Sequence, residues 1–169
     1  MIILGNVVSM LGCMTMVLTG FLRKKEQILM AQCVQFGFLA AGNLILGGVT
    51  GFISGTVSIA RNLVFAFTGG SRNWKIGFIA LQAVLTFLPG WPGLVGCLPL
   101  GSGVILTWFL DAKNDVQLKL AIIAAQVIWA IYDWSYQNFV AFAFDIFTIL
   151  SNLVGILIIW KQMQEESRL

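Results

Sequence analysis

The sequence predicts an all-α integral membrane protein with seven transmembrane helices, and its composition and the spacing of its charges carry this prediction. Of the 169 residues, 59% are hydrophobic and 10% are charged, whereas about a quarter of the residues are charged in an average soluble domain. The N-terminus opens directly into apolar sequence without a basic region or a cleavage site, so we expect no removable signal peptide.

Charged clusters divide the chain into apolar segments, most of them close to the roughly 20 residues that a helix needs to cross a bilayer core. We expect spans at residues 2–22, 27–46, 50–68, 74–88, 92–110, 117–134 and 138–160. The fourth is the shortest, and the PGWPG sequence that follows it favours a turn.

The positively charged residues predict the orientation of the spans. They lie after the first, third and fifth spans and in the C-terminal tail, as Arg23, Lys24, Lys25, Arg72, Lys75, Lys113, Lys119, Lys161 and Arg168. The loops LGGVT, PGWP and SYQN have none. Because cytoplasmic loops are enriched in Lys and Arg, we expect the N-terminus outside and the C-terminus in the cytoplasm. Topology explains the net charge of +3, so no nucleic-acid partner is implied.

The residues that usually bind metals or catalyse reactions are scarce. The chain has no His. Its cysteines, Cys13, Cys33 and Cys97, lie in apolar runs without CxxC spacing, and we expect them to pack as small hydrophobic residues. We therefore predict no metal, no cofactor and no enzymatic activity.

Two parts of the chain resemble each other. The segment LGCMTMVLTGFL from Leu11 resembles LGSGVILTWFL from Leu100, and SIARNLV and TILSNLV set Asn62 and Asn152 in the same frame. Chance similarity among helices rich in Leu, Ile and Val is the alternative.

The same frame aligns Asn43 with Asp133. We expect residues 1–70 and 91–169 to form two parallel three-helix bundles, joined by a linker helix in residues 71–90. Such a 3+1+3 arrangement puts the symmetry axis along the membrane normal.

Asn62 and Asn152 are the first candidates for a substrate site, because duplicated helices place equivalent residues opposite one another near mid-depth. An amide donates and accepts hydrogen bonds, which suits a small polar solute. Ser58, Ser151 and Thr148 lie on neighbouring turns and could line the same cavity. Hydrogen bonding between helices is the alternative role for the two amides.

Besides Lys75 and Lys119 at the cytoplasmic ends of their spans, three charged residues lie within the predicted spans, where such residues usually face a partner or a water-filled cavity. Arg61 lies near the level of Asn152 and is a candidate substrate ligand. Asp145 lies roughly 9 Å further out at 1.5 Å per residue, which favours a gate or a proton-carrying group. A charge pair between Arg61 and Asp145 is the alternative. Asp133 is a second candidate for the gate, with an interfacial position as its alternative.

Trp129 is the one Trp deep in a predicted span, so it is the candidate wall of a pocket, with packing as the alternative. Tyr132 follows it and is a candidate gate residue. The other Trp residues lie near span ends, where aromatic belts anchor membrane proteins.

These features resemble the SWEET, semiSWEET and PQ-loop (MtN3-like) superfamily of transporters. NLVG at 152–155 resembles the NxxG of SWEET third helices, and WAIY at 129–132 resembles their WxxY. The first bundle reads NLVF and FGFL instead. CLPLGSGVILTWFL and SIARNLV are more similar to the YgjV-type bacterial inner-membrane proteins of that superfamily, over most of the chain.

The resemblance implies a SWEET-like fold in the bacterial inner (plasma) membrane and alternating access to a central site. It implies that Asn152 matches the sugar-contacting Asn of SWEETs, with Asn62 as its partner. Arg61 has no counterpart in the sugar carriers, so an anionic or zwitterionic metabolite is the alternative substrate.

A small-solute transporter, either a uniporter or a proton-coupled carrier, is the function that these features favour. Its partners would be a small polar solute or sugar and the membrane lipid, and a second copy of the chain is a further candidate. The alternative is a non-transporting receptor or scaffold protein with the same fold.

Overall fold

Seven helices make up the computed structural model, which describes residues 1–19, 25–68, 71–109, 112 and 115–166. They are α1 (Ile2–Thr19), α2 (Lys25–Ile45), α3 (Val49–Thr68), α4 (Arg72–Phe87), α5 (Gly93–Phe109), α6 (Asp115–Ser135) and α7 (Phe139–Glu166). Within these residues there is no strand, and each predicted span coincides with one helix.

The largest difference from the predicted bounds is at the end of α7, which continues to Glu166. The residues after the predicted span contain no Gly or Pro to end the helix. Lys161 and Glu165 also approach to 3.9 Å at i, i+4 spacing, a pairing that supports exposed helices.

Helix length and composition separate α4 from the others. Among the described residues, three helices are long and apolar enough to cross a membrane, at Val49–Thr68, Val116–Ser135 and Phe139–Lys161. Shorter apolar segments lie at Ile2–Thr15, Leu29–Ile45 and Gly93–Phe109. In the part of the chain that the structure describes, α4 belongs to neither group, which agrees with its being the shortest predicted span.

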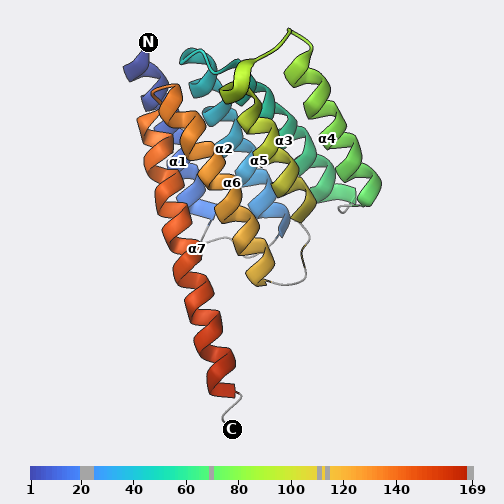
Figure 1. The fold of residues 1–169 in the computed structure, drawn as a ribbon, viewed down its shortest axis with the longest axis vertical. Coiled ribbons are helices and arrows are strands. Elements are labelled where there is room, and N and C mark those ends of the chain that lie inside the picture. Colours follow the sequence, from blue (N-terminus) through green and yellow to red (C-terminus); the bar gives the residue numbers. More distant parts are fainter. Residues whose placement is uncertain (20–24, 69–70, 110–111, 113–114, 167–169) are drawn as a thin grey trace.

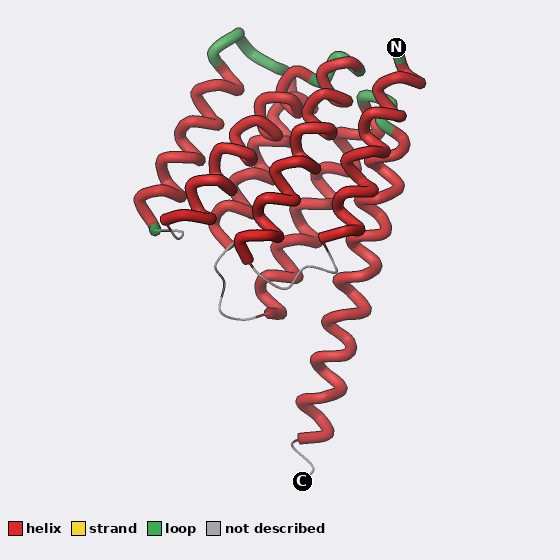
Figure 2. The backbone as a smooth tube through the Cα atoms, turned by 180° about the vertical axis from the view of Figure 1, so that it is seen from behind, coloured by secondary structure: helices red, strands yellow, loops and turns green. Residues whose placement is uncertain are grey.

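Six helices form a closed ring, with α4 outside it (Figure 1). Around the ring, α1, α2, α3, α5, α6 and α7 pack in that order, and α7 returns to contact α1. The N-terminus and the α2–α3, α4–α5 and α6–α7 connections lie at one end, which we call the N-terminal end. The view from behind in Figure 2 shows α7 extending past the ring at the opposite end, which carries the C-terminus.

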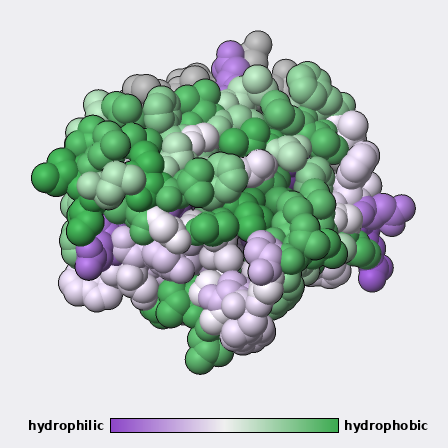
Figure 3. Space-filling model, turned by 90° about the horizontal axis from the view of Figure 1, so that it is seen from above, coloured by the Kyte–Doolittle hydropathy of each residue, from purple (hydrophilic) through white to green (hydrophobic). Residues whose placement is uncertain are grey.

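The distribution of side chains is the reverse of that in a water-soluble protein. Large apolar side chains such as Leu94 and Phe147 are exposed, whereas polar side chains such as Asn62 and Ser102 are fully buried. Apolar side chains make up much of the surface seen from above in Figure 3. Water disfavours so large an exposed apolar surface, so lipid is its natural surrounding.

Small residues let α1 and α2 approach closely, a common feature of membrane helix pairs. Gly42 of α2 faces Ser9 of α1, and a Cβ at position 42 would meet the Ser9 hydroxyl and lie 3.0 Å from the backbone oxygen of Gly5. Ser9 is fully buried. The two helix backbones therefore depend on glycine at this crossing.

We expect Gly42→Ala to lower the free energy of unfolding by about 1–3 kcal/mol, because the added methyl group overpacks the contact. Unfolding of the purified protein in mixed micelles measures it. Gly37→Ala is the matched control, since the same helix has open space there, and alanine favours a helix by up to about 1 kcal/mol. Equal destabilisation by both changes would contradict this account of the crossing.

The α2–α3 and α6–α7 turns have the same geometry. The backbone N–H of Gly48 donates to Asn43 O at 2.7 Å, and that of Asn138 donates to Asp133 O at 2.8 Å. One residue in each turn has a positive φ, namely Gly47 (87°) and Gln137 (58°). Glycine adopts this conformation without steric cost, whereas glutamine does not.

Gln137→Gly is expected to raise the free energy of unfolding by about 0.5–1 kcal/mol. Relief of the left-handed backbone gives about 1–2 kcal/mol, and the greater freedom of glycine in the unfolded chain removes about 0.5–1 kcal/mol. Gly47→Ala should lower stability, because alanine is strained at this positive φ. A Cβ there meets nothing within 4 Å, so the loss would come from the backbone alone. Chemical denaturation of both variants tests the pair, and a loss of stability in Gln137→Gly would refute the argument.

Candidate functional site

A cavity of about 300 Å³ lies inside the ring. All six ring helices contribute to its wall. Of the side chains predicted from the sequence, Ser58, Arg61, Trp129, Asp133, Asp145, Thr148 and Asn152 line it. The volume lies at the lower end of the range for small-molecule sites.

Arg61 is the buried cation of this cavity, with 4% of its surface exposed. Its Nη1 donates to Thr107 Oγ1 at 3.0 Å, and its Nε and Nη2 donate to Asn62 Oδ1 at 3.2 and 3.1 Å. All these acceptors are neutral. Among the described residues, Arg61 makes no ion pair with Asp145 or any other carboxylate, so the predicted charge pair is not formed.

The two candidate asparagines have different surroundings. Asn62 is fully buried, does not line the cavity, and donates to Gln32 Oε1 at 2.9 Å. Asn152 lines the cavity, and its amide donates to the Thr148 backbone oxygen of its own helix at 2.8 Å. Asn62 thus orients Arg61 and Gln32, while Asn152 contributes to the wall directly.

Ser151 is exposed and is not part of the cavity wall. It precedes Asn152 on α7, and successive helical positions point about 100° apart. Consequently, the helix face that carries Thr148 and Asn152 into the cavity turns Ser151 outward.

Asp133 and Asp145 form an acid pair on the other side of the cavity. Their carboxyl groups are close enough to interact electrostatically. They are 3% and 9% exposed, and Asp145 Oδ2 has no hydrogen-bond partner. Asp133 lines the cavity from the last turn of α6, which ends at Ser135.

The acid pair adjoins a polar cluster that joins α2 to the α6–α7 turn. Nδ2 of Asn138, which is fully buried, donates to Asn43 Oδ1 at 3.1 Å and to Asp133 Oδ1 at 3.4 Å. Asn43 is 3% exposed. We call this cluster and the contacts of Tyr132 and Asn6 described next the N-terminal clasp.

Tyr132 crosses the ring to the start of α3. Its hydroxyl accepts a hydrogen bond from the Gly51 backbone N–H at 2.7 Å and one from Thr50 Oγ1 at 3.3 Å. The first N–H groups of a helix have no partner within the helix, so Tyr132 caps α3 from α6. A Cβ at Gly48 or Gly51 would lie 2.6 or 2.7 Å from this hydroxyl, and glycine at both positions leaves it room.

Asn6 fastens α1 to α7 at the same end. Its Nδ2 donates to the Gln137 backbone oxygen at 2.9 Å, and its Oδ1 accepts from the Val140 N–H at 3.0 Å. Of the side-chain hydrogen bonds described here, those between α1 and the α6–α7 segment lie at the N-terminal end.

The α3–α5 side of the ring is bonded along its length. Gln82 of α4 donates to Ser54 Oγ at 2.9 Å and to the Pro99 backbone oxygen at 3.0 Å. Arg61 adds its bond to Thr107 further along α3. We call this side, which is hydrogen-bonded at the levels of Ser54 and Arg61 and supported from outside by α4, the seam.

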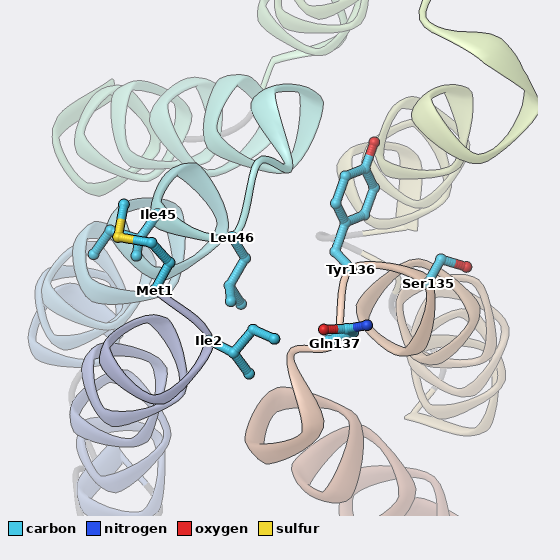
Figure 4. A pocket seen from close by; sticks show the side chains of 7 residues that line it. All are labelled: Met1, Ile2, Ile45, Leu46, Ser135, Tyr136 and Gln137. Atoms are coloured by element: carbon cyan, nitrogen blue, oxygen red, sulfur yellow. The ribbon is translucent and has the colours of Figure 1, made fainter.

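A second hollow, of about 190 Å³, opens at the N-terminal end (Figure 4). It is lined by Met1, Ile2, Ile45, Leu46, Ser135, Tyr136 and Gln137. Ile2 and Leu46 point toward its centre from one side, and Gln137 lies on the other. The clasp residues Asn43 and Tyr132 lie about one helical turn further in.

Several cavity residues were not predicted from the sequence. They are polar side chains in apolar spans, including Gln32, Gln35, Ser54, Ser102 and Gln126. An uncharged Gln in a membrane helix is a signal in itself, because its amide needs a partner or water. Gln32 and Gln35 are also spaced as neighbours on one helix face.

A helical chain with apolar side chains outside and a polar cavity within is an integral membrane protein. The chain belongs to the Imp-YgjV family, described as bacterial inner membrane protein, whose model matches residues 3–163. Its place is accordingly the bacterial inner membrane. No curated protein and no solved structure matches the chain.

Proposed function

We propose that this protein carries a small polar solute across the inner membrane by alternating access to the central cavity. The observation that carries the proposal is the cavity itself, which has charged and amide side chains inside a ring whose outer surface is apolar. Buried charges in a membrane protein are costly and usually serve a function. Charged side chains around a cavity therefore favour the binding of a polar solute there.

The uneven fastening of the ring supports alternating access. The N-terminal clasp joins α1, α2 and α3 to α6 and α7 at one end, whereas the seam between α3 and α5 runs along the ring. Opening the clasp and parting α1 from α7, with the seam as the hinge, would expose the cavity at the N-terminal end.

The charges of the connections support an orientation with the N-terminal end outside. The connections at that end, residues 46–48, 88–92 and 136–138, contain no Lys or Arg. Lys119 and Lys161 lie toward the opposite end, as expected for the cytoplasmic side.

The matched turns support an internal duplication of the SWEET type. Equivalent positions would then be Asn43 with Asp133 and Gly48 with Asn138, which have the same turn geometry. In this proposal the two repeats are the halves that move during transport, and the acid pair is the candidate site for a coupled proton.

Uptake by the reconstituted protein tests the proposal. Proteoliposomes would be incubated with a mixed pool of small metabolites, and solutes enriched over protein-free vesicles would be identified by mass spectrometry. Repeating the uptake with an inward proton gradient distinguishes a proton-coupled carrier, which would accumulate solute, from a uniporter, which would not.

Filling the cavity is expected to reduce uptake at least about tenfold, because a solute cannot share a space of this size with an indole. Thr148→Trp projects the ring into the cavity, and Phe147→Trp is the matched control, since Phe147 is 67% exposed. Equal uptake by the two variants, or no solute enriched by the unmodified protein, would refute the carrier.

A further inference from the structure

Arg61 is a buried cation whose charge no carboxylate balances among the described residues. The guanidinium has five N–H donors, and its bonds to Asn62 and Thr107 use only neutral acceptors. A buried charge in a membrane protein normally has a counter-ion. The cavity beside Arg61 is the place where one can bind.

The acid pair lacks a cationic partner among the described residues, as Arg61 lacks an anionic one. Asp133 and Asp145 are both acidic side chains, and the described part of the structure gives them no cationic partner. Asp145 Oδ2, on a carboxyl group more than nine-tenths buried, accepts no hydrogen bond. A donor from a solute is what this oxygen lacks.

The two groups line the same cavity at different depths. Asp145 follows the start of α7 by less than two turns, whereas Arg61 follows the start of α3 by more than three. Since α3 and α7 both begin at the N-terminal end, the two Cα atoms differ by roughly 9 Å along the ring. The cavity therefore has a negative side near the clasp and a positive side further in.

We infer that the substrate is a small zwitterion bearing a primary ammonium and a carboxylate. Its carboxylate would bind Arg61, and its ammonium would bind Asp145 and Asp133. This assignment rests on the proposed function and adds the class of solute. A neutral sugar would leave both charges unpaired, and a simple anion would leave the acid pair without a donor.

Binding to the detergent-solubilised protein tests the inference without any need for turnover. The probes are glycine, β-alanine, 4-aminobutyrate and 6-aminohexanoate, which separate the two charges progressively. For each length, the matching carboxylate without the amine and the matching amine without the carboxylate are measured alongside. We expect one length to bind at least about tenfold more tightly than either of its single-charge counterparts, as a lost charge-assisted hydrogen bond predicts.

Two variants assign the ends of the zwitterion. In Arg61→Gln the zwitterion should bind no better than the amine alone, and in Asp145→Asn no better than the carboxylate alone. Arg61→Lys and Asp145→Glu keep the charges and should retain part of the preference. Ser151→Ala, at an exposed position of α7, should bind as the unmodified protein does.

The outcomes separate this inference from the proposed function. The inference is refuted if the single-charge probes bind as tightly as every zwitterion. It is also refuted if none of the twelve probes binds. A zwitterion that binds with the expected pattern but does not enter proteoliposomes supports the inference and refutes the carrier alone. Uptake of other solutes by a protein that binds no zwitterion supports the carrier and refutes the inference alone.

Discussion

Tyr132→Phe is expected to lower the free energy of unfolding by about 2 kcal/mol, although only one oxygen atom is removed. The hydroxyl is fully buried and accepts the hydrogen bond of the Gly51 N–H at 2.7 Å. Without it, the N–H of Gly51, which is buried in the first turn of α3, loses its acceptor. Equilibrium unfolding in mixed micelles measures the change.

Tyr136→Phe is the control for this substitution. Tyr136 lies four residues further along, in the turn that follows α6, is partly exposed, and its ring packs 4.7 Å from that of Tyr132. Its hydroxyl makes no hydrogen bond described here, so the change should cost less than about 0.5 kcal/mol, as for most surface substitutions. Similar losses in both variants would mean that ring packing, and not the cap on α3, stabilises this junction.

The helices could be predicted closely from the sequence because the membrane imposes simple limits on it. Each span needs a minimum apolar length, and charged residues must lie near its ends. For that reason the predicted span at 50–68 differs by one residue from α3. The end of α7 was missed because the charged residues after Trp160 mark the end of the membrane span, whereas the helix continues through them to Glu166.

The direction in which side chains face could be predicted only in part. Arg61 lines the cavity, as expected for a charged residue within a span, and so do Asn152, which was chosen from the repeat, and Thr148, which lies one turn from it. Asn62 was chosen as the repeat equivalent of Asn152, and Ser151 as a neighbour on the same helix, but neither lines the cavity. Depth does not determine the rotation of a helix, which depends on packing against its neighbours.

The N-terminal clasp could not be predicted, because it joins residues distant in the sequence through single hydrogen bonds. Tyr132 and Gly51 meet only once the ring has closed. The same holds for Asn6 and the α6–α7 turn. No periodicity or motif encodes such a pairing, although the positions of Gly48 and Gly51 make sense once the tyrosine is known to lie against them.

The clasp and the acid pair share a residue, and this connects the two sites physically. Asp133 accepts a hydrogen bond from Asn138 in the clasp and lines the cavity together with Asp145. A solute ammonium that binds the acid pair would compete with Asn138 for the oxygens of Asp133. Occupation of the cavity could in this way loosen the end of the ring through which the solute enters.

Asn138→Ala is expected to increase the labelling rate of Cys13 by a membrane-impermeant thiol reagent about tenfold or more. Cys13 lines the cavity and is 2% exposed, so the reagent can reach it only when the ring opens. Losing the bonds to Asn43 and Asp133 favours the open state, and about 1.4 kcal/mol changes the equilibrium tenfold. Labelling would be measured in vesicles of known orientation, with Cys33 and Cys97 replaced by alanine.

Asn73→Ala removes an equivalent amide from an exposed position on α4 and should leave the labelling rate unchanged. The side of the membrane is a second control, since the faster rate should be seen when the reagent is added at the N-terminal end. Faster labelling from the opposite end only would place the closed gate at the C-terminal end instead. An unchanged rate from both ends would mean that the clasp stabilises the fold without governing access to the cavity.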